Sequence, residues 1–272
     1  MQEASFVAAA VQLTSTSEVN RNWEAASALV REAADSGALL VATPENTNFL
    51  GPHEEKVRRA EPLEGPTCTR FSGLARECEI FLLLGSFNER SEEVDRCYNT
   101  SVLFGPDGKR LAVYRKMHLF DIDLSDEVRF QESATIKPGD EIVVAETELG
   151  ALGLSVCYDL RFGELYRALT QAGAEIFCVP SAFTWTTGKA HWELLLRTRA
   201  VENQCFVIAP AQCGRHDDRG LRRSWGHSII IDPWGQILAI AGEEPGVTLA
   251  ELDAKKITEV RQSMPVANHR RL

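Results

Sequence analysis

The stretch Gly153-Leu-Ser-Val-Cys157-Tyr-Asp-Leu-Arg-Phe162 is the most informative part of this 272-residue chain. An apolar strand leads into Cys157, and polar, aromatic and basic residues follow at once. We expect a thiol at such a strand-to-helix elbow to be partly exposed, with the first backbone N–H groups of the next helix favouring the thiolate. The alternative is a structural cysteine that ends a buried strand. The stretch alone is compatible with both interpretations.

Two further segments place a charged residue directly after a predicted strand. Glu45 follows the apolar run 38–42, and the proline before it stiffens the chain. Lys116 ends the alternating segment 110–116. Glu45 is therefore a candidate general base, and Lys116 is a candidate cation for stabilising a developing negative charge. Either residue alone is typical of a solvated surface charge.

Strand-like and helical segments alternate along most of the chain. The turn Gly105-Pro-Asp-Gly108 joins two strands, and a second hairpin flanks 232–235. Antiparallel pairs beside helix-separated strands favour a two-sheet core with helices outside, in a mixed α/β fold. The predicted strands are 6–13, 38–42, 80–87, 100–104, 110–116, 175–179 and 206–209, and the predicted helices are 20–34, 65–77, 162–171 and 189–202.

Together, Glu45, Lys116 and Cys157 resemble the Glu, Lys, Cys triad of the nitrilase superfamily of carbon–nitrogen hydrolases. The resemblance spans nearly the whole chain, from Val11-Gln-Leu13 to Asp232-Pro-Trp-Gly235. Its Nit branch, which is similar to the deaminated glutathione amidases, is indicated by the segments Gly188-Lys-Ala-His-Trp-Glu193, Leu196-Arg-Thr-Arg-Ala-Val-Glu202 and Ala211-Gln-Cys-Gly-Arg-His216. One departure is Gly163, which stands where the branch usually carries a proline.

The resemblance implies a four-layer α-β-β-α sandwich and an amidase mechanism. Cys157 is then the nucleophile and forms a thioester, while Glu45 takes the thiol proton and returns one to the departing amine. Lys116 and the backbone N–H of Tyr158 would hold the oxyanion. A second glutamate of the superfamily lies between the lysine and the cysteine, and Glu132 is the candidate for it.

Two alternatives remain open for these roles. The alternative for Glu132 is a solvated carboxylate in a surface loop, because Asp123, Asp126 and Glu127 make the same region acidic. The usual partner of a catalytic cysteine is a histidine, and His118 lies two residues after Lys116, on the same side of a strand. We expect His118 to be a hydrogen-bonded supporting residue instead.

The candidate substrate-binding residues are Arg161, Phe183 and Thr184. Arg161 lies four residues after Cys157 and is expected either to grip a substrate carboxylate or to brace Asp159. The resemblance implies hydrolysis of a small 2-oxo acid amide, most specifically deaminated glutathione, to 2-oxoglutarate and cysteinylglycine. An omega-amidase or N-carbamoyl amine hydrolase is the runner-up. A non-catalytic scaffold is the hypothesis of another class.

Composition limits the remaining possibilities. The 44% apolar content predicts one domain over 1–272, and a net charge of −10 argues against a nucleic acid partner. No apolar run approaches the roughly 20 residues of a membrane-spanning helix. Seven irregularly spaced cysteines without a CxxC pair predict neither disulfides nor a metal site, and no cofactor is expected. Reduced thiols predict a cytoplasmic protein.

The first residues, Met1 to Phe6, lack the basic region of a secretion signal. The amphipathic segments 162–171 and 189–202 need a partner surface. Together with the resemblance, they predict a homodimer or a larger homo-oligomer.

Overall fold

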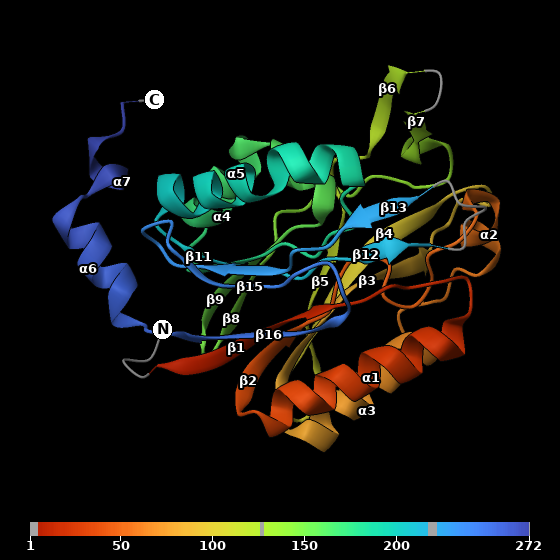
Figure 1. Cartoon of the computed structure of the whole chain (residues 1–272), viewed down its shortest axis with the longest axis horizontal. Helices are drawn as coiled ribbons and strands as arrows, with labels where there is room; N and C mark the ends of the chain where they lie inside the picture. The colour runs from red at the N-terminus through yellow and green to blue at the C-terminus, as the bar shows by residue number, and fades with distance from the viewer. Residues whose placement is uncertain (1–4, 126–127, 217–221, 272) are drawn as a thin grey trace.

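A computed structural model of the chain describes residues 5–125, 128–216 and 222–271. Two six-stranded sheets pack against each other, and helices cover both outer faces (Figure 1). The predicted mixed α/β fold, a four-layer α-β-β-α sandwich, is therefore confirmed. Among the described residues, no helix is long and apolar enough to cross a membrane.

The first sheet has the strand order β16-β1-β2-β3-β4-β5. Its first three sequential strands are parallel because helices connect them, whereas β3, β4 and β5 form an antiparallel meander. The strands are β1 (Phe6–Gln12), β2 (Ala38–Ala42), β3 (Phe81–Arg90), β4 (Cys97–Phe104), β5 (Arg110–Arg115) and β16 (Gly246–Leu252). The connecting helices are α1 (Val19–Asp35) and α3 (Pro66–Cys78).

The second sheet has the order β15-β14-β11-β10-β9-β8. Helices α4 (Gly163–Gln171) and α5 (Trp185–Asn203) connect its parallel strands β9, β10 and β11. The predicted hairpin at 232–235 joins β14 to β15. The strands are β8 (Val144–Thr147), β9 (Gly150–Leu154), β10 (Ile176–Cys178), β11 (Phe206–Ala209), β14 (Ile229–Ile231) and β15 (Ile237–Ile240).

Strand β1 contributes side chains to two separate hydrophobic cores, one on each face of its sheet. Ala8 and Ala10 belong to the core between the sheets, while Ala9 and Val11 pack with the residues of α1 and α3. Successive side chains of a strand point to opposite faces, so a strand covered on both sides is apolar at every position. This explains why 6–13 has no polar alternation.

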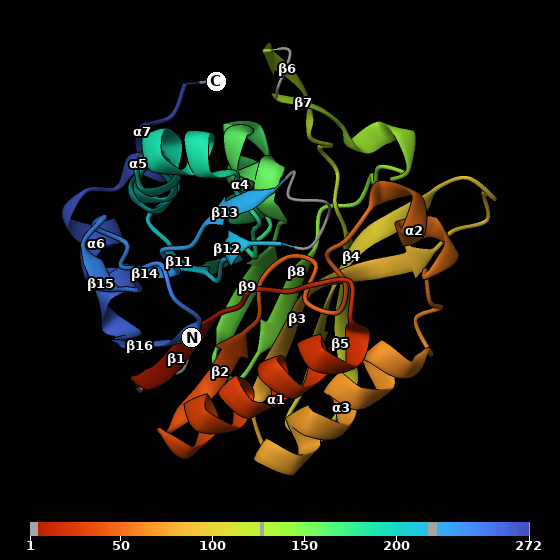
Figure 2. The same cartoon turned by 45° about the vertical axis from the view of Figure 1, so that its right-hand side comes forward.

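Short elements that the sequence analysis did not predict surround one end of the sandwich. Figure 2 shows β6 and β7 beyond the strands of both sheets, and α2 beside β3 and β4. These elements are α2 (His53–Arg58), β6 (Asp121–Ser125), β7 (Val128–Gln131), the 3₁₀ turn Glu132–Ala134, β12 (Cys213–Arg215) and β13 (Arg223–Trp225). Two further helices, α6 (Lys255–Ser263) and α7 (Val266–His269), follow the last strand.

Candidate active site

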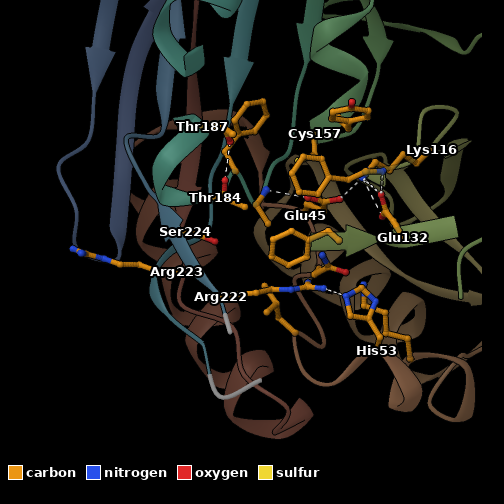
Figure 3. A pocket seen from close by; sticks show the side chains of 18 of the residues that line it. Glu45, His53, Lys116, Glu132, Cys157, Thr184, Thr187, Arg222, Arg223 and Ser224 are labelled. Carbon is orange, nitrogen blue, oxygen red and sulfur yellow. Dashed lines mark hydrogen bonds and ion pairs between the residues drawn. The ribbon is translucent and has the colours of Figure 1, made fainter. Parts of the chain in front are cut away.

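The carboxyl ends of several strands meet at one pocket. Glu45 follows β2, Lys116 follows β5, Cys157 follows β9, and Glu132 follows β7. All four side chains are buried and line the pocket (Figure 3). The other predicted site residues, Tyr158, Arg161, Phe183 and Thr184, line it as well. The structure thus brings every predicted site residue to one place.

Cys157 is held in an unusual backbone conformation. Its φ of 51° lies in the left-handed region, which costs free energy for any residue with a Cβ. The Cys157 N–H donates to Pro180 O at 2.9 Å, which fixes the elbow against the neighbouring strand end. A 3₁₀ helix over Cys157–Arg161 follows, and α4 begins only at Gly163. A side chain at Gly163 would meet the guanidinium of Arg199 at 3.0 Å.

Asp159 supports the elbow from behind. Its carboxylate accepts hydrogen bonds from Tyr114 Oη at 2.7 Å and from the Val156 N–H at 2.8 Å. The other carboxylate oxygen contacts the N–H and the Nδ1 of His118 at 3.0 and 2.7 Å. The His118 ring also stacks on Phe162, with centroids 3.7 Å apart. These contacts place His118 in the supporting position that the sequence predicted, rather than beside the thiol.

Tight packing against β3 positions the loop that carries Glu45. A Cβ at Gly85 would lie 1.9 Å from Thr43 O, so β3 needs a glycine where this loop crosses it. Ser86 Oγ accepts a hydrogen bond from the Asn46 N–H at 2.8 Å, directly after Glu45. The loop therefore has one position relative to the sheet.

The carboxylate of Glu45 is fully engaged by three donors. Its Oε1 accepts from Lys116 Nζ at 3.0 Å and from Asn99 Nδ2 at 2.9 Å. Its Oε2 accepts from the Ala182 N–H at 2.9 Å. These contacts hold the carboxylate in the pocket that Cys157 also lines, and its charge raises the pKa of the Cys157 thiol.

Lys116 bridges two buried carboxylates. Its Nζ lies 2.8 and 3.1 Å from the two oxygens of Glu132, which also accepts the Phe120 N–H at 2.7 Å. Burial alone would lower the pKa of Lys116, but the charges of Glu132, Glu45 and Cys157 outweigh burial and raise it well above its usual value. Burial would likewise raise the pKa of Glu132, but the ammoniums of Lys116 and Lys56 lower it to about 2. Lys116 is therefore a fixed cation, and Glu132 is a fixed anion.

The acidic residues that competed with Glu132 do not share its position. Asp123 is an exposed residue of β6. Asp126 and Glu127 lie outside the described residues.

The expectation of an exposed cysteine with a depressed pKa is wrong. Cys157 is only 8% exposed. Burial raises the pKa of its thiol well above the usual value, and the Glu45 carboxylate raises it further, whereas Lys116 and the Ala182 N–H lower it by less. The resting cysteine is thus a thiol, and its activation requires a nearby base to take the proton; Glu45 is the carboxylate whose charge acts on it most strongly.

The candidate substrate residues form one wall of the pocket. The Arg161 guanidinium lies over the rings of Tyr158 and Phe183, 5.6 and 5.5 Å from their centroids, and 3.4 Å from His191 Nδ1. Its predicted alternative partner, Asp159, is instead occupied by the elbow contacts described above. Thr184 precedes the first turn of α5, and its Oγ1 lies 2.8 Å from Thr187 Oγ1.

The pocket encloses about 650 Å³ of empty space, including the solvent at its mouth. Several polar residues that line the pocket, or that contact its carboxylates from behind, were not predicted from the sequence. Asn99 is buried and donates to Glu45, but an asparagine at the start of a strand carries no distinctive pattern. The polar lining residues that were not predicted are Asn46, His53, Lys56, Thr187, Arg222, Arg223 and Ser224. His53 and Lys56 lie in a segment rich in charge, which is typical of a solvated helix.

Comparisons with known proteins agree with this geometry. The chain is 44% identical to the deaminated glutathione amidase of Synechocystis sp. over 97% of this chain and 98% of that protein. It is also 44% identical to the omega-amidase of Homo sapiens, over 98% of this chain and 95% of that protein. The crystal structure of the C. elegans NitFhit protein superposes with a TM-score of 0.93 at 37% identity. That match covers 100% of this chain and 66% of the nematode protein, which is just under two thirds.

The family match extends over almost the entire described chain. Residues 7–262 match the carbon-nitrogen hydrolase family, a stretch that includes both sheets, all four outer-layer helices and the pocket. With this match and relatives above 40% identity, the chain belongs to the carbon-nitrogen hydrolase family, in the Nit branch of the nitrilase superfamily.

Proposed function

We propose that this protein is a cysteine-dependent amidase that hydrolyses deaminated glutathione to 2-oxoglutarate and cysteinylglycine. The observation that carries the proposal is that one buried thiol shares a pocket with the Glu45 carboxylate and with an ammonium that two carboxylates hold in place. Relatives named deaminated glutathione amidase at 44% identity support the choice of substrate. We assign the whole described chain to one catalytic domain that works without a cofactor.

The geometry suggests how the amide bond breaks. The Cys157 sulfur attacks the amide carbon while Glu45 takes the thiol proton. The developing oxyanion is stabilised by Lys116 Nζ and by the N–H of Tyr158, which lies in the first turn of a 3₁₀ helix where N–H groups have no partner within the helix. When the tetrahedral intermediate collapses, the C–N bond breaks and Glu45 protonates the departing amine.

The second half of the cycle releases the acid. Water attacks the thioester carbon, Glu45 takes a proton from that water, and the C–S bond breaks as the thiol is restored. Glu132 does not move protons in this scheme, because its pKa of about 2 keeps it ionised at neutral pH. Its role is to hold Lys116 in position.

Arg161 is assigned to the carboxylate of the 2-oxo acid half. In Arg161→Met, kcat/KM for a 2-oxo acid amide should fall at least about tenfold, because a charge-assisted pair contributes roughly 1.5 to 3 kcal/mol. A neutral amide of similar size should be affected far less. Steady-state kinetics with both substrates test this assignment. An equal fall for both would mean that Arg161 only supports the elbow.

A second candidate activity is that of an omega-amidase, which releases ammonia rather than a dipeptide. The human omega-amidase is as similar in sequence to this chain as the Synechocystis relative is. Comparing kcat/KM for 2-oxoglutaramate and deaminated glutathione distinguishes the two proposals. We expect deaminated glutathione to be the better substrate.

We propose that two copies of the chain assemble through α5 and the β14–β15 turn. Leu194 and Val201 on α5 are 65% and 49% exposed, and Trp234 in that turn is 55% exposed. Arg197 Nε, between the two α5 residues, donates to Gly235 O at 3.0 Å, so helix and turn form one surface.

Sedimentation at micromolar concentration should find a dimer or a larger assembly, and Leu194→Lys should shift it toward monomer, because a buried charge opposes association. A wild-type species of only 30.1 kDa would contradict the assignment. Each of the seven cysteines is a free thiol, which supports a reducing compartment, and we propose the cytoplasm.

A further inference from the structure

Lys56 is a buried cation with no ion-pair partner among the residues that the structure describes. It lies on α2, is 2% exposed and lines the pocket. Among the described residues, no hydrogen bond or ion pair involves its ammonium, whereas Lys116 contacts two carboxylates. Burying an unpaired ammonium is unfavourable, and such a group calls for an explanation in function.

His53, one helical turn before Lys56, is a second donor without an acceptor. The guanidinium of Arg222 only donates, so the His53 Nε2 that it contacts is the unprotonated nitrogen. Burial, with the charges of Lys56 and Arg222, lowers the pKa of His53 to about 3. The ring is therefore neutral and carries its hydrogen on Nδ1, which is buried without a partner. At spacing i, i+3, both donors lie on the same face of α2.

The pocket as a whole carries an excess of positive charge. Among the described residues, five cationic side chains line it against two carboxylates, a difference of three, in a protein whose net charge is −10. Lys116 is neutralised by the two carboxylates, and Arg223 pairs at the surface with Glu243. Of the other three, Arg222 contacts His53, while Arg161 and Lys56 come from different elements, the 3₁₀ helix after Cys157 and α2. One substrate carboxylate, at Arg161, leaves Lys56 without a counter-charge.

We propose that Lys56, with His53 beside it, binds a carboxylate on the leaving-amine half of the substrate, so that the pocket selects amides with a carboxylate on each side of the scissile bond. This inference rests on the proposed amidase function and names the residue that recognises its second half. The occupant is a dipeptide or amino acid carboxylate. Ammonia as the leaving group would leave Lys56 without a ligand.

The position of Lys56 decides which half of the substrate it contacts. Lys56 lies on α2, which packs against β3, whereas Arg161 lies on the 3₁₀ helix that follows Cys157, so the two cations reach the pocket from different elements. In Figure 3, His53 and Arg222 lie below Glu45, and Thr187 lies above it. Glu45 protonates the departing amine, so the leaving half extends from Glu45 toward α2.

The test compares deaminated glutathione with its C-terminal carboxamide, which has nearly the same size but lacks the second carboxylate. Wild-type enzyme should prefer the carboxylate form. Lys56→Met keeps an unbranched side chain one atom shorter and removes the charge, so it should lower kcat/KM for the carboxylate form at least about tenfold, mainly through KM. Its effect on the carboxamide should stay within about twofold. Circular dichroism checks that the variant is folded.

Arg161→Met is the matched control, because both substrates keep the 2-oxo acid carboxylate and should lose activity equally. If wild type hydrolyses neither substrate, the proposed function fails, and the inference fails with it. If wild type hydrolyses both equally well, the Lys56 inference alone is overturned. It is also overturned if Lys56→Met lowers kcat equally for both, since Lys56 would then act through Glu132 or Glu45.

A measurement on the wild type keeps the test valid should the variant not fold. Burial, then the charge of Arg222, lowers the pKa of Lys56 to about 8, while Glu132, Glu45 and Cys97 limit the fall. Raising the pH from 7 to about 9.5 removes the ammonium charge of the free enzyme. The ratio of kcat/KM for carboxylate and carboxamide should then fall several-fold, because ionisations common to both substrates cancel. A constant ratio contradicts the inference.

Discussion

Replacing Cys157 by alanine is expected to lower turnover on the order of 10⁶-fold, the scale on which loss of a nucleophile acts in other hydrolases. The fold should persist, because the substitution removes one sulfur and keeps the Cβ that the left-handed backbone already accommodates. Cys157→Ser should restore little of the lost turnover. A hydroxyl is a far weaker acid than a thiol, and a carboxylate such as Glu45 is a poor base for it.

Cys178→Ala is the matched control for this prediction. Cys178 is also a buried free thiol, in the neighbouring strand β10, and burial raises its pKa to about 12. Its removal should change kcat by only a few-fold. Turnover near the wild-type level in Cys157→Ala would rule out covalent catalysis at this elbow.

Lys116→Ala should lower kcat on the order of 100-fold or more, because it removes a fixed oxyanion donor. It also leaves two buried carboxylates without their cation, so the pKa of Glu132 should rise from about 2. Breaking a buried pair of this kind costs about 3 to 5 kcal/mol of stability. Lys116→Arg should also lower kcat strongly, since a planar guanidinium does not fit the space of a compact ammonium.

Lys137→Ala controls for the loss of a lysine, because Lys137 pairs with Glu92 and Glu93 near the surface. It should keep wild-type kinetics. The kcat of Lys116→Ala should be measured on protein whose folded fraction is known from chemical denaturation. An unchanged kcat with a raised KM would instead make Lys116 a substrate anchor.

The sequence predicts the buried strands well and the pocket-forming elements poorly. The run 38–42 coincides with β2 and 206–209 with β11, because strands covered on both faces are continuously apolar. In contrast, α5 begins at Trp185 rather than at 189. The glycine at 188 is typical of a break, but here a Cβ would lie 2.3 Å from Trp225 Cβ, so packing requires it. A local sequence pattern gives no information about this contact, because the two residues are distant in the sequence.

The same limit applies to the site. Glu45, Lys116 and Cys157 were predictable because each follows a strand and the three match a family pattern. The protonation state of the Cys157 thiol was not predictable, because it depends on burial and on a carboxylate that is distant in the sequence. Lys56 was not predictable either. A lysine among charged residues on a short helix is usually solvated, and only the tertiary packing of α2 buries it.

The most direct test of the account is to quench wild-type enzyme during turnover of deaminated glutathione and to map acylation by mass spectrometry. We predict release of 2-oxoglutarate and cysteinylglycine in equal amounts, with a 2-oxoglutaryl thioester on the peptide that contains Cys157. Release of both products without any acyl-enzyme in the quenched samples or in a pre-steady-state burst would contradict covalent catalysis. Acylation of another cysteine, or no release from this amide, would contradict the assigned nucleophile or the assigned substrate.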